Sequence, residues 1–389
     1  MHILVIPSER YLPKDRPLEG IFQKDNAVAL HDSGLTVGIL SIELHGIRKM
    51  IGQRRFFVHD RVVHTKEEGI TVSRISAIAP PNRYPRIFRP FWVLKGKQVF
   101  KEYVKTYGMP DVIHAHNALN AGLLALELKK EYKLPYVVTE HSSQFIKGAF
   151  TPWEKRKIHT VFSHADALIA VSPSLGEVIK RYLSSHQTVS VVPNPLDRLF
   201  ENDTRLKNRA EGVVFFSLAA LVATKGFFEL LESFAKSFQG DSAKKLVIGG
   251  DGPERDSLEQ YASELGIEKQ VTFVGLLSKK EVKRHMEACD VFVLASHFET
   301  FGVVITEALA CGKPVVATQC GGPEYLIDDS NGLLVPPKET GALAVALQKM
   351  ANSFDSYDGK AIRMACLHRY GSAKIASVLQ SIYNKLLEH

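Results

Sequence analysis

Short apolar runs alternate with stretches of helical periodicity along the whole chain. In the first half the runs are rich in Val, Ile and Leu and are apolar on both faces, as in strands of a parallel sheet that helices cover on each side. We expect strands at residues 3–6, 37–42, 112–114, 136–139, 167–171 and 189–192. Helical stretches lie between them, for example at residues 21–31, 119–132 and 175–184.

The same alternation begins again in the second half. Strands are expected there at residues 213–218, 245–248, 271–274, 291–295, 314–317 and 332–335. Two consecutive series of this kind predict an α/β protein with two doubly wound parallel-sheet domains. In such sheets ligands bind beyond the carboxyl ends of the strands, so a cleft between the domains is the expected site.

The domain boundary is expected near residues 192–197, where Pro193, Asn194 and Pro195 follow a strand. This division gives a first domain over residues 1–195 and a second over residues 196–371. A last helix, at residues 372–389, has no strand after it and is expected to pack back on the first domain.

Composition excludes several classes of protein. The chain has 389 residues, of which 45% are hydrophobic and 23% are charged, so it is neither disordered nor a disulfide scaffold. No apolar run approaches the roughly 20 residues that span a bilayer. The first residues lack the basic region of a signal peptide, and the four cysteines form no C-x-x-C pair. We therefore expect a cytoplasmic protein with buried thiols.

Charge is unevenly distributed. Residues 1–200 carry 28 lysines and arginines against 18 acidic residues, whereas residues 201–389 carry 21 against 24. The basic first half suggests an anionic partner, such as a membrane surface, a phosphate-bearing substrate or nucleic acid. Nucleic acid is disfavoured because no recognition motif accompanies the charge.

Residues 296–317 carry the most informative chemistry. A strand ends at residue 295, Glu299 lies in the following loop, and a helix opens at about Gly302. Backbone N–H groups at a helix start bind anions such as phosphate. Glu307 lies inside this helix, so the two carboxylates could reach different parts of one extended ligand. The alternative is a capping carboxylate and a solvated helix residue.

This segment resembles the E-x7-E signature of retaining glycosyltransferases of family 4. Further motifs follow in the order that this family has: an Arg-Leu-x-x-x-Lys-Gly-like loop, a Gly-x-Gly-Pro-Glu turn, a Val-x-Phe-x-Gly strand and five others. They lie at residues 220–226, 249–254, 271–275, 321–324, 331–337, 111–116, 138–141 and 192–194. The resemblance therefore covers nearly the whole chain.

The resemblance implies the GT-B fold, in which two Rossmann-like domains face each other across a cleft. It also implies transfer of a sugar from a nucleotide-diphosphate donor, such as a UDP- or GDP-sugar, with retention of anomeric configuration. The first domain would bind a glycan or lipid-linked acceptor and the second the donor. The setting would be bacterial surface or exopolysaccharide biosynthesis, in the cytoplasm or on the inner face of its membrane.

The resemblance also implies roles for individual residues. Glu299 and His141 would act at the donor sugar, Glu307 would bind the ribose and Lys225 the diphosphate. Further donor contacts would come from the backbone of Thr300, Phe301, Gly302, Val303, Gly20 and Leu277.

Two departures bear on the donor site. Ala220 occupies the position where the family usually has arginine, so one diphosphate cation is missing. No Asp-x-Asp pair occurs in the chain. Such a pair commonly holds the metal in metal-dependent glycosyltransferases, so we expect activity without a metal ion, with Lys225 and the helix start binding the phosphates.

Histidines and a basic aromatic stretch leave alternatives open. His141 follows a strand and is a cleft residue or a buried structural histidine. His114 and His116 share a strand face, and we find no further ligands for a metal there. Residues 83–97 mix Arg, Lys, Phe and Trp. They suit either a membrane interface or an ordinary helix with its rings packed inward, and Arg48, Lys49, Arg54 and Arg55 add charge nearby.

Three other functions remain to be compared. A nucleotide-sugar 2-epimerase shares the two-lobed fold, but product analysis distinguishes it because it forms no new glycosidic bond. A non-catalytic nucleotide- or carbohydrate-binding relative is conceivable because of Ala220, although Glu299, Glu307 and Lys225 argue against it. An NAD-linked oxidoreductase is remote, since no G-x-G-x-x-G follows the first strand.

Overall fold

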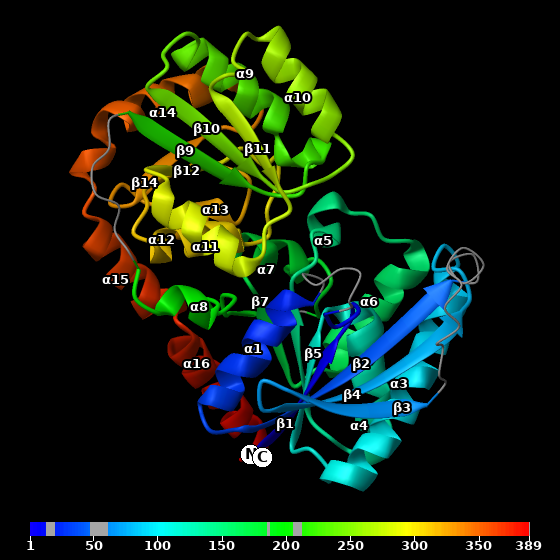
Figure 1. Ribbon diagram of the computed structural model, residues 1–389. Helices are drawn as coiled ribbons and strands as arrows, with labels where there is room; N and C mark the ends of the chain where they lie inside the picture. The colour runs from blue at the N-terminus through cyan, green and yellow to red at the C-terminus, as the bar shows by residue number, and fades with distance from the viewer. Residues whose placement is uncertain (13–19, 47–60, 185–186, 205–211, 389) are drawn as a thin grey trace. The chain divides into compact units, whose positions relative to one another are not determined.

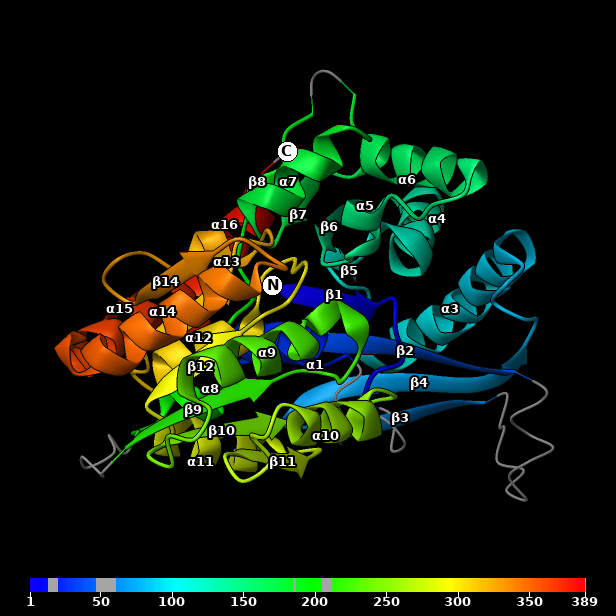
Figure 2. The same cartoon turned by 90° about the horizontal axis from the view of Figure 1, so that it is seen from above.

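The computed structural model describes residues 1–12, 20–46, 61–184, 187–204 and 212–388. Arg48, Lys49, Arg54 and Arg55 lie outside these residues. The chain divides into two compact units (Figures 1 and 2). The first unit is Met1–Pro195 with Ser372–His389, and the second unit is Leu196–Gly371. Where the chain enters and leaves the second unit, the Leu196 N–H donates to the Tyr370 carbonyl at 2.8 Å.

The first unit holds an eight-stranded sheet. Its strands in spatial order are β3 (Val62–Glu67), β4 (Ile70–Ala79), β2 (Thr36–Gly46), β1 (His2–Pro7), β5 (Val112–His116), β6 (Tyr136–Glu140), β7 (Ala167–Ala170) and β8 (Ser190–Val191). All neighbours pair in parallel except β3 with β4. The expected parallel sheet is thus confirmed, with one antiparallel edge strand.

Helices cover this sheet on both faces. Val37 and Ile39 of β2 pack in a core with α1 (Ile21–Asp32) and α16 (Ser372–Leu387). A Cβ at Gly38, between them, would meet the Tyr103 ring of α3 (Pro85–Tyr107), so α3 covers the opposite face. The other α-helices described in this unit are α4 (Leu123–Tyr132), α5 (Gln144–Lys147), α6 (Pro152–His164) and α7 (Pro173–Lys180).

The second unit holds a six-stranded, all-parallel sheet. Its strands in spatial order are β11 (Val271–Gly275), β10 (Lys244–Gly249), β9 (Val213–Leu218), β12 (Val291–Leu294), β13 (Val315–Thr318) and β14 (Gly332–Val335). Numbered within the unit, the order is 3-2-1-4-5-6, which is that of Rossmann folds. The two doubly wound sheets confirm the predicted fold class.

Two layers of helices enclose the second sheet. One core joins alternate strand residues such as Phe215 and Val293 to α9 (Phe227–Phe238), α10 (Arg255–Glu264) and α14 (Thr340–Ser353). The Phe216 ring, one position along, stacks on His285 of α11 (Lys279–Ala288) on the other face. The other α-helices in the described part of this unit are α8 (Arg198–Glu201), α12 (Val303–Ala310), α13 (Pro323–Leu326) and α15 (Gly359–Tyr370).

All twelve strands predicted from the sequence are present, whereas β3 and β4 were not predicted. One predicted helix is wrong at its start. Residues 119–132 do not form one helix, because Leu119 is extended and Asn120 has φ 62°, so regular α-helix begins only at Leu123. The helix expected at residues 175–184 is α7, which begins and ends earlier.

Candidate functional site

In each sheet the strand order reverses between two neighbouring strands, and candidate residues lie in the loops that follow those strands. In the first unit the reversal lies between β1 and β5, and in the second between β9 and β12. The loops that leave these strands at their carboxyl ends diverge and leave room for a ligand. They carry Ser8 and Asn117 in the first unit, and Lys225 and Glu299 in the second.

A lysine and a carboxylate meet at the reversal point of the second sheet. Lys225 Nζ lies 2.5 Å from Glu299 Oε1, and the Ser296 hydroxyl donates to the same oxygen at 2.8 Å. Both partners of the ion pair keep some exposure, 25% for the lysine side chain and 16% for the glutamate. The pair is therefore ordered but accessible to a ligand.

Backbone contacts hold the two loops of this pair together. The His297 N–H donates to the Thr224 carbonyl at 2.9 Å, and His297 Nε2 lies 2.8 Å from Glu229 Oε1. Gly226 has φ 68°, and a Cβ there would lie 2.0 Å from the Ala295 carbonyl oxygen. Only glycine allows the loop of Lys225 to approach β12 this closely.

The start of α12 provides unpaired backbone donors beside Glu299. Gly302 precedes the helix with φ 98°, and Phe301 is buried, with its ring 6.0 Å from that of Tyr370. In the described part of the chain, no acceptor receives the N–H groups of Thr300, Phe301, Gly302 and Val303. An anion placed here would gain several hydrogen bonds at a helix start.

Glu307 lies inside α12, as the sequence predicts, but it is not a solvated residue. It is 2% exposed and ion-paired with Lys279 at the start of α11. Burial raises the pKa of Glu307, and the Lys279 ammonium opposes that shift. A ligand reaching Glu307 would therefore compete with Lys279.

The remaining donor-binding candidates lie in loops. Gly20 caps α1 of the first unit with φ 82°, and a Cβ there would lie 3.0 Å from the Arg10 carbonyl oxygen. Leu277 is buried and immediately precedes Ser278, the capping residue of α11. Ala220 is exposed in the loop that leads to Lys225.

Three histidines stack at the carboxyl ends of β5 and β6. The ring centroids of His114 and His116 are 4.4 Å apart, and those of His116 and His141 are 5.1 Å apart. His116 Nδ1 lies 2.8 Å from His141 Nε2. The Asn117 side chain accepts from the backbone N–H of His141 at 3.0 Å. His141 is thus fixed through both its ring and its backbone.

Burial keeps these histidines neutral at physiological pH. It lowers the pKa of His114 to about 3 and that of His141 to about 4, and it places the pKa of His116 well below the ordinary value. The other histidines in the stack lower the pKa values of His114 and His116 further. The His141 side chain is therefore a neutral imidazole at neutral pH.

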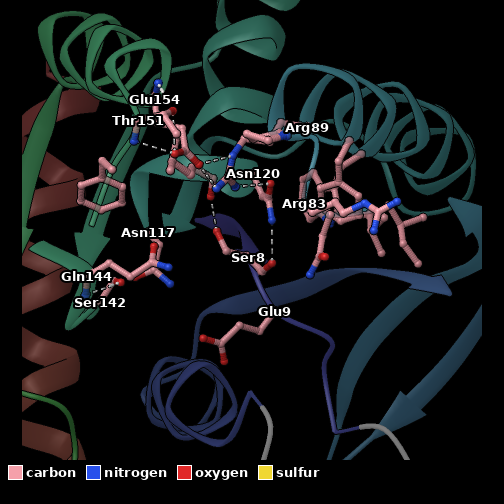
Figure 3. Close-up of a pocket in the computed structure, with 18 of the residues that line it drawn as sticks. Ser8, Glu9, Arg83, Arg89, Asn117, Asn120, Ser142, Gln144, Thr151 and Glu154 are labelled. Atoms are coloured by element: carbon pink, nitrogen blue, oxygen red, sulfur yellow. Dashed lines mark hydrogen bonds and ion pairs between the residues drawn. The ribbon is translucent and has the colours of Figure 1, made fainter. Parts of the chain in front are cut away.

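A cavity of about 800 Å³ lies beside this stack in the first unit (Figure 3). One wall is a polar network: Arg89 donates to Glu154 at 2.5 Å and to Asn120 at 2.9 Å. Asn120 in turn donates to the Ser8 carbonyl at 3.2 Å. The apolar part of the lining is Ile42, Leu44, Pro85, Phe88, Trp92, Leu119, Phe145 and Phe150.

A buried carboxyl group, Glu140, also lines this cavity. It accepts from the backbone N–H groups of Ala118, His141 and Ser142 at 2.9–3.1 Å. Burial raises its pKa to about 7, and these three hydrogen bonds oppose the shift. Glu140 thus connects the loop of Asn117 to that of His141.

The basic aromatic stretch forms the start of α3, where some of its apolar side chains are buried and others are exposed, and membrane contact stays a prediction. Trp92 is buried, as in an ordinary helix. Tyr84, Ile87 and Leu94 are 49–61% exposed. A second cavity of about 820 Å³ shares Phe145 with the first, and its lining has five basic and no acidic side chains: Lys147, Lys155, Arg156, His159 and Arg181.

The sequence analysis named candidate residues in each unit but not the residues that contact them. Ser296, Lys279, Asn117 and Glu140 were not predicted, and His116 was predicted only as a packed strand end. Ser296 lies three residues before Glu299 and could have been suspected from that spacing. The other partners join segments that only the fold brings together.

The described residues contain neither a metal site nor a membrane-spanning helix. No group of three or more His, Cys, Asp or Glu side chains there is arranged to hold a metal ion. None of the helices described is long and apolar enough to cross a membrane. The four cysteines are buried and free, as expected.

Comparison with known families agrees with this architecture. Residues 200–358 match the family described as "Glycosyl transferases group 1", and residues 52–198 match "Glycosyltransferase Family 4". Two Rossmann-like units and matches over both halves define a glycosyltransferase of the GT-B fold. The chain belongs to glycosyltransferase family 4.

Individual relatives support the assignment. TuaC of Bacillus subtilis, a glycosyltransferase named for teichuronic acid biosynthesis, is 28% identical over 90% of this chain and 89% of its own. Bacillus anthracis N-acetyl-alpha-D-glucosaminyl L-malate synthase is 26% identical over 71% and 75%.

Solved structures share the fold at low identity. The sucrose-phosphate synthase of Thermosynechococcus elongatus superposes with a TM-score of 0.79 at 20% identity, covering 100% of this chain and 99% of its own. Anabaena HepE, solved in complex with UDP, has a TM-score of 0.74 at 19% identity, covering 99% and 100%.

Proposed function

We propose that this glycosyltransferase moves a sugar, with retention and without a metal ion, from a nucleotide-diphosphate sugar to a glycan or lipid-linked acceptor in bacterial surface polysaccharide synthesis. The observation that carries the donor part is the Lys225–Glu299 pair beside the unpaired N–H groups at the start of α12. A lysine and a helix start together neutralise the charge that a departing nucleoside diphosphate develops.

The ion pair also suggests separate roles for Lys225 and Glu299 in donor binding. When the donor diphosphate arrives, Lys225 exchanges the Glu299 carboxylate for phosphate oxygens, and Glu299 is released toward the sugar hydroxyls. Glu307 binds the ribose by exchanging Lys279 for ribose hydroxyls. UDP is the first nucleotide to test, since HepE was solved with it.

The first unit is proposed to bind the acceptor in the cavity of Figure 3. Its network of Arg89, Glu154 and Asn120 provides fixed donors and acceptors for sugar hydroxyls, and Trp92 and Phe88 provide apolar surface. His141 contacts the donor sugar as a neutral residue.

Peripheral contact with an anionic membrane is proposed for the same unit. Tyr84, Ile87 and Leu94 project from α3, and the basic second cavity adjoins the first through Phe145. Exposed apolar side chains in the same unit as a group of basic side chains suit the headgroup region of anionic lipids. Such contact would bring a lipid-linked acceptor to its cavity.

Calorimetric titration with UDP, GDP and ADP, each with excess chelator, tests the donor site. One nucleotide is expected to bind clearly, and Lys225→Ala is expected to weaken it by tenfold or more, on the order of a lost charged hydrogen bond. Lys236→Ala, an exposed lysine of α9, is the matched control. If all three nucleotides fail to bind, or if Lys225→Ala binds as tightly as the wild type, the donor site is wrong.

Sedimentation with vesicles tests the membrane contact. The protein is expected to bind vesicles of phosphatidylcholine with phosphatidylglycerol but not phosphatidylcholine alone. Exchanging Lys155, Arg156 and Arg181 for glutamate should abolish binding. The same exchange at Lys101, Lys130 and Lys133 is the control for charge alone, and equal losses in both triple variants would contradict a localised surface.

A further inference from the structure

The stack of His114, His116 and His141 is also a set of hydrogen bonds whose protons can be assigned. Burial leaves all three imidazoles neutral. A neutral imidazole has one N–H donor and one acceptor nitrogen. In the 2.8 Å contact between His116 Nδ1 and His141 Nε2, one ring must therefore donate and the other accept.

The surroundings of His116 select the donor. Its other nitrogen, Nε2, is buried and has no partner in the described part of the chain. If His141 donated, the proton of His116 would sit on Nε2 as a buried N–H without an acceptor. Buried N–H groups without partners are rarer than unpaired acceptors because losing the donor's solvation is costly. His116 therefore donates from Nδ1.

The surroundings of His141 agree. With Nε2 accepting, its own proton is on Nδ1. The Asn194 side chain lies close enough to this ring to oppose the fall of its pKa, although the two groups are not well aligned for a hydrogen bond. The buried Asn194 Oδ1, an acceptor, has no other partner among the described residues. A proton on His141 Nδ1 suits this acceptor.

His114 provides an internal comparison, because its partners require the opposite tautomer. Tyr383 of α16 and His114 Nδ1 are 2.7 Å apart, and His114 Nε2 lies 2.7 Å from the Thr139 hydroxyl. No other acceptor for the Tyr383 hydroxyl occurs among the described residues. The phenol therefore donates to Nδ1, and the proton of His114 is on Nε2.

We propose that His116 is a positioning residue, whose Nδ1–H holds His141 in the neutral tautomer that carries its proton on Nδ1. His141 then presents a hydrogen-bond donor at one fixed atom. The value of that donor for sugar transfer rests on the proposed function, whereas the tautomer itself does not.

Nitrogen-15 NMR of protein labelled at histidine tests the tautomers directly. Signals are assigned by their loss in His114→Asn, His116→Asn and His141→Asn. At pH 7 the proton is expected on Nδ1 in His116 and His141 and on Nε2 in His114. A wild-type His141 with its proton on Nε2 overturns the proposal, whether or not sugar transfer is ever detected.

Two substitutions at His116 separate hydrogen bonding from packing. His116→Asn retains an N–H near the position of Nδ1, whereas His116→Phe retains a stacked ring without a donor. The Phe variant is expected to lose the single His141 tautomer. With the donor identified by calorimetry, its kcat should fall about tenfold, as for one lost hydrogen bond, with little change in the donor KM. The Asn variant should keep the single His141 tautomer, and its kcat should fall clearly less than that of the Phe variant.

The control for a histidine-to-phenylalanine substitution as such is His368→Phe, because His368 is an exposed residue of α15. Thermal unfolding of each variant confirms folding. If His116→Phe keeps both the His141 tautomer and kcat, or if Phe and Asn variants lose the tautomer alike, His116 does not position His141.

Discussion

Lys225 and Glu299 are 74 positions apart in the chain, yet Nζ and Oε1 lie 2.5 Å from each other. The two side chains form an ion pair, and the Ser296 hydroxyl donates a hydrogen bond to the same carboxylate oxygen. The site is therefore charge-balanced as it stands, and under the proposed function a nucleoside diphosphate would enter by exchange with Glu299 rather than by neutralising a free cation.

This exchange predicts opposite effects at the two residues. Glu299→Gln frees Lys225, so nucleotide affinity should stay equal or rise a few-fold, while sugar transfer falls about 100-fold or more with the loss of a charge at the reacting sugar. Calorimetry and a product assay measure the two effects. Glu229→Gln, which alters only the contact to His297, is the control. Weaker nucleotide binding in Glu299→Gln would contradict the exchange.

Ala220→Arg restores the cation that the family usually has. Because Ala220 is exposed in the same loop as Lys225, an arginine there has room to reach the diphosphate. We expect UDP to bind about tenfold more tightly, as for one charged hydrogen bond. Ala220→Gln supplies the length without the charge, and an equal gain in both variants would remove the electrostatic explanation.

Gly226→Ala should disrupt the loop of Lys225. The new Cβ would lie 2.0 Å from the Ala295 carbonyl oxygen at φ 68°. We expect a loss of more than about 2 kcal/mol in the free energy of unfolding, together with weak nucleotide binding. Gly240→Ala is a matched control, since φ is also positive there but nothing lies within 4 Å. Similar losses of unfolding free energy at both sites would mean that the positive φ, and not the contact with Ala295, causes the destabilisation.

Tyr383→Phe should destabilise the first unit. The substitution leaves His114 Nδ1 buried without its donor, at an expected cost of about 1–3 kcal/mol in the free energy of unfolding. Chemical denaturation measures the change. Tyr107→Phe, on an exposed tyrosine of α3, should change it by less than about 0.5 kcal/mol. A neutral Tyr383→Phe would show that the contact contributes nothing.

The low pKa of His114 predicts how stability depends on pH. Burial lowers this pKa from 6.5 to about 3, so between these values the unfolded chain binds a proton that the folded protein does not. The contribution of His114 is therefore present above pH 6.5 and is lost as pH falls toward 3, by up to about 1.4 kcal/mol per unit.

Urea denaturation of the wild type and His114→Gln at pH 7, 6 and 5 measures this contribution. The free energy of unfolding should fall more steeply with decreasing pH in the wild type than in the variant. The raised pKa of Glu140 acts in the opposite direction but is common to both proteins. Parallel curves would show that His114 becomes protonated without cost in the folded state.

The fold could be predicted where strands are buried on both faces. Strands such as β1 and β12 appear in the sequence as continuous apolar runs, which is typical of covered parallel sheets. β4 contains Ser73, Arg74 and Ser76, and β3 is largely exposed at the sheet edge, so neither has such a run. Their pairing depends on the sheet beside them.

Candidate site residues could be named from the sequence where they lie next to a strand end or a helix start. Glu299 and Glu307 were predicted in this way and Lys225 from the family resemblance, and their roles stay predictions. Their state could not be predicted, since the pairing of Glu307 with Lys279 and of His116 with His141 arises only when distant segments pack. The alternative that Glu307 is a solvated helix residue is wrong, because Glu307 is buried in α12 and paired with Lys279 of α11.

The hydrogen bond between Leu196 and Tyr370 shows that the chain enters and leaves the second unit at one place. In topological terms that unit is a single insertion into the first, with its two junctions adjacent. Two neighbouring breaks are thus enough to exchange the whole of it as a cassette. Under the proposed function, recombination of this kind would change the donor specificity while leaving the cavity and the histidine stack of the first unit unchanged.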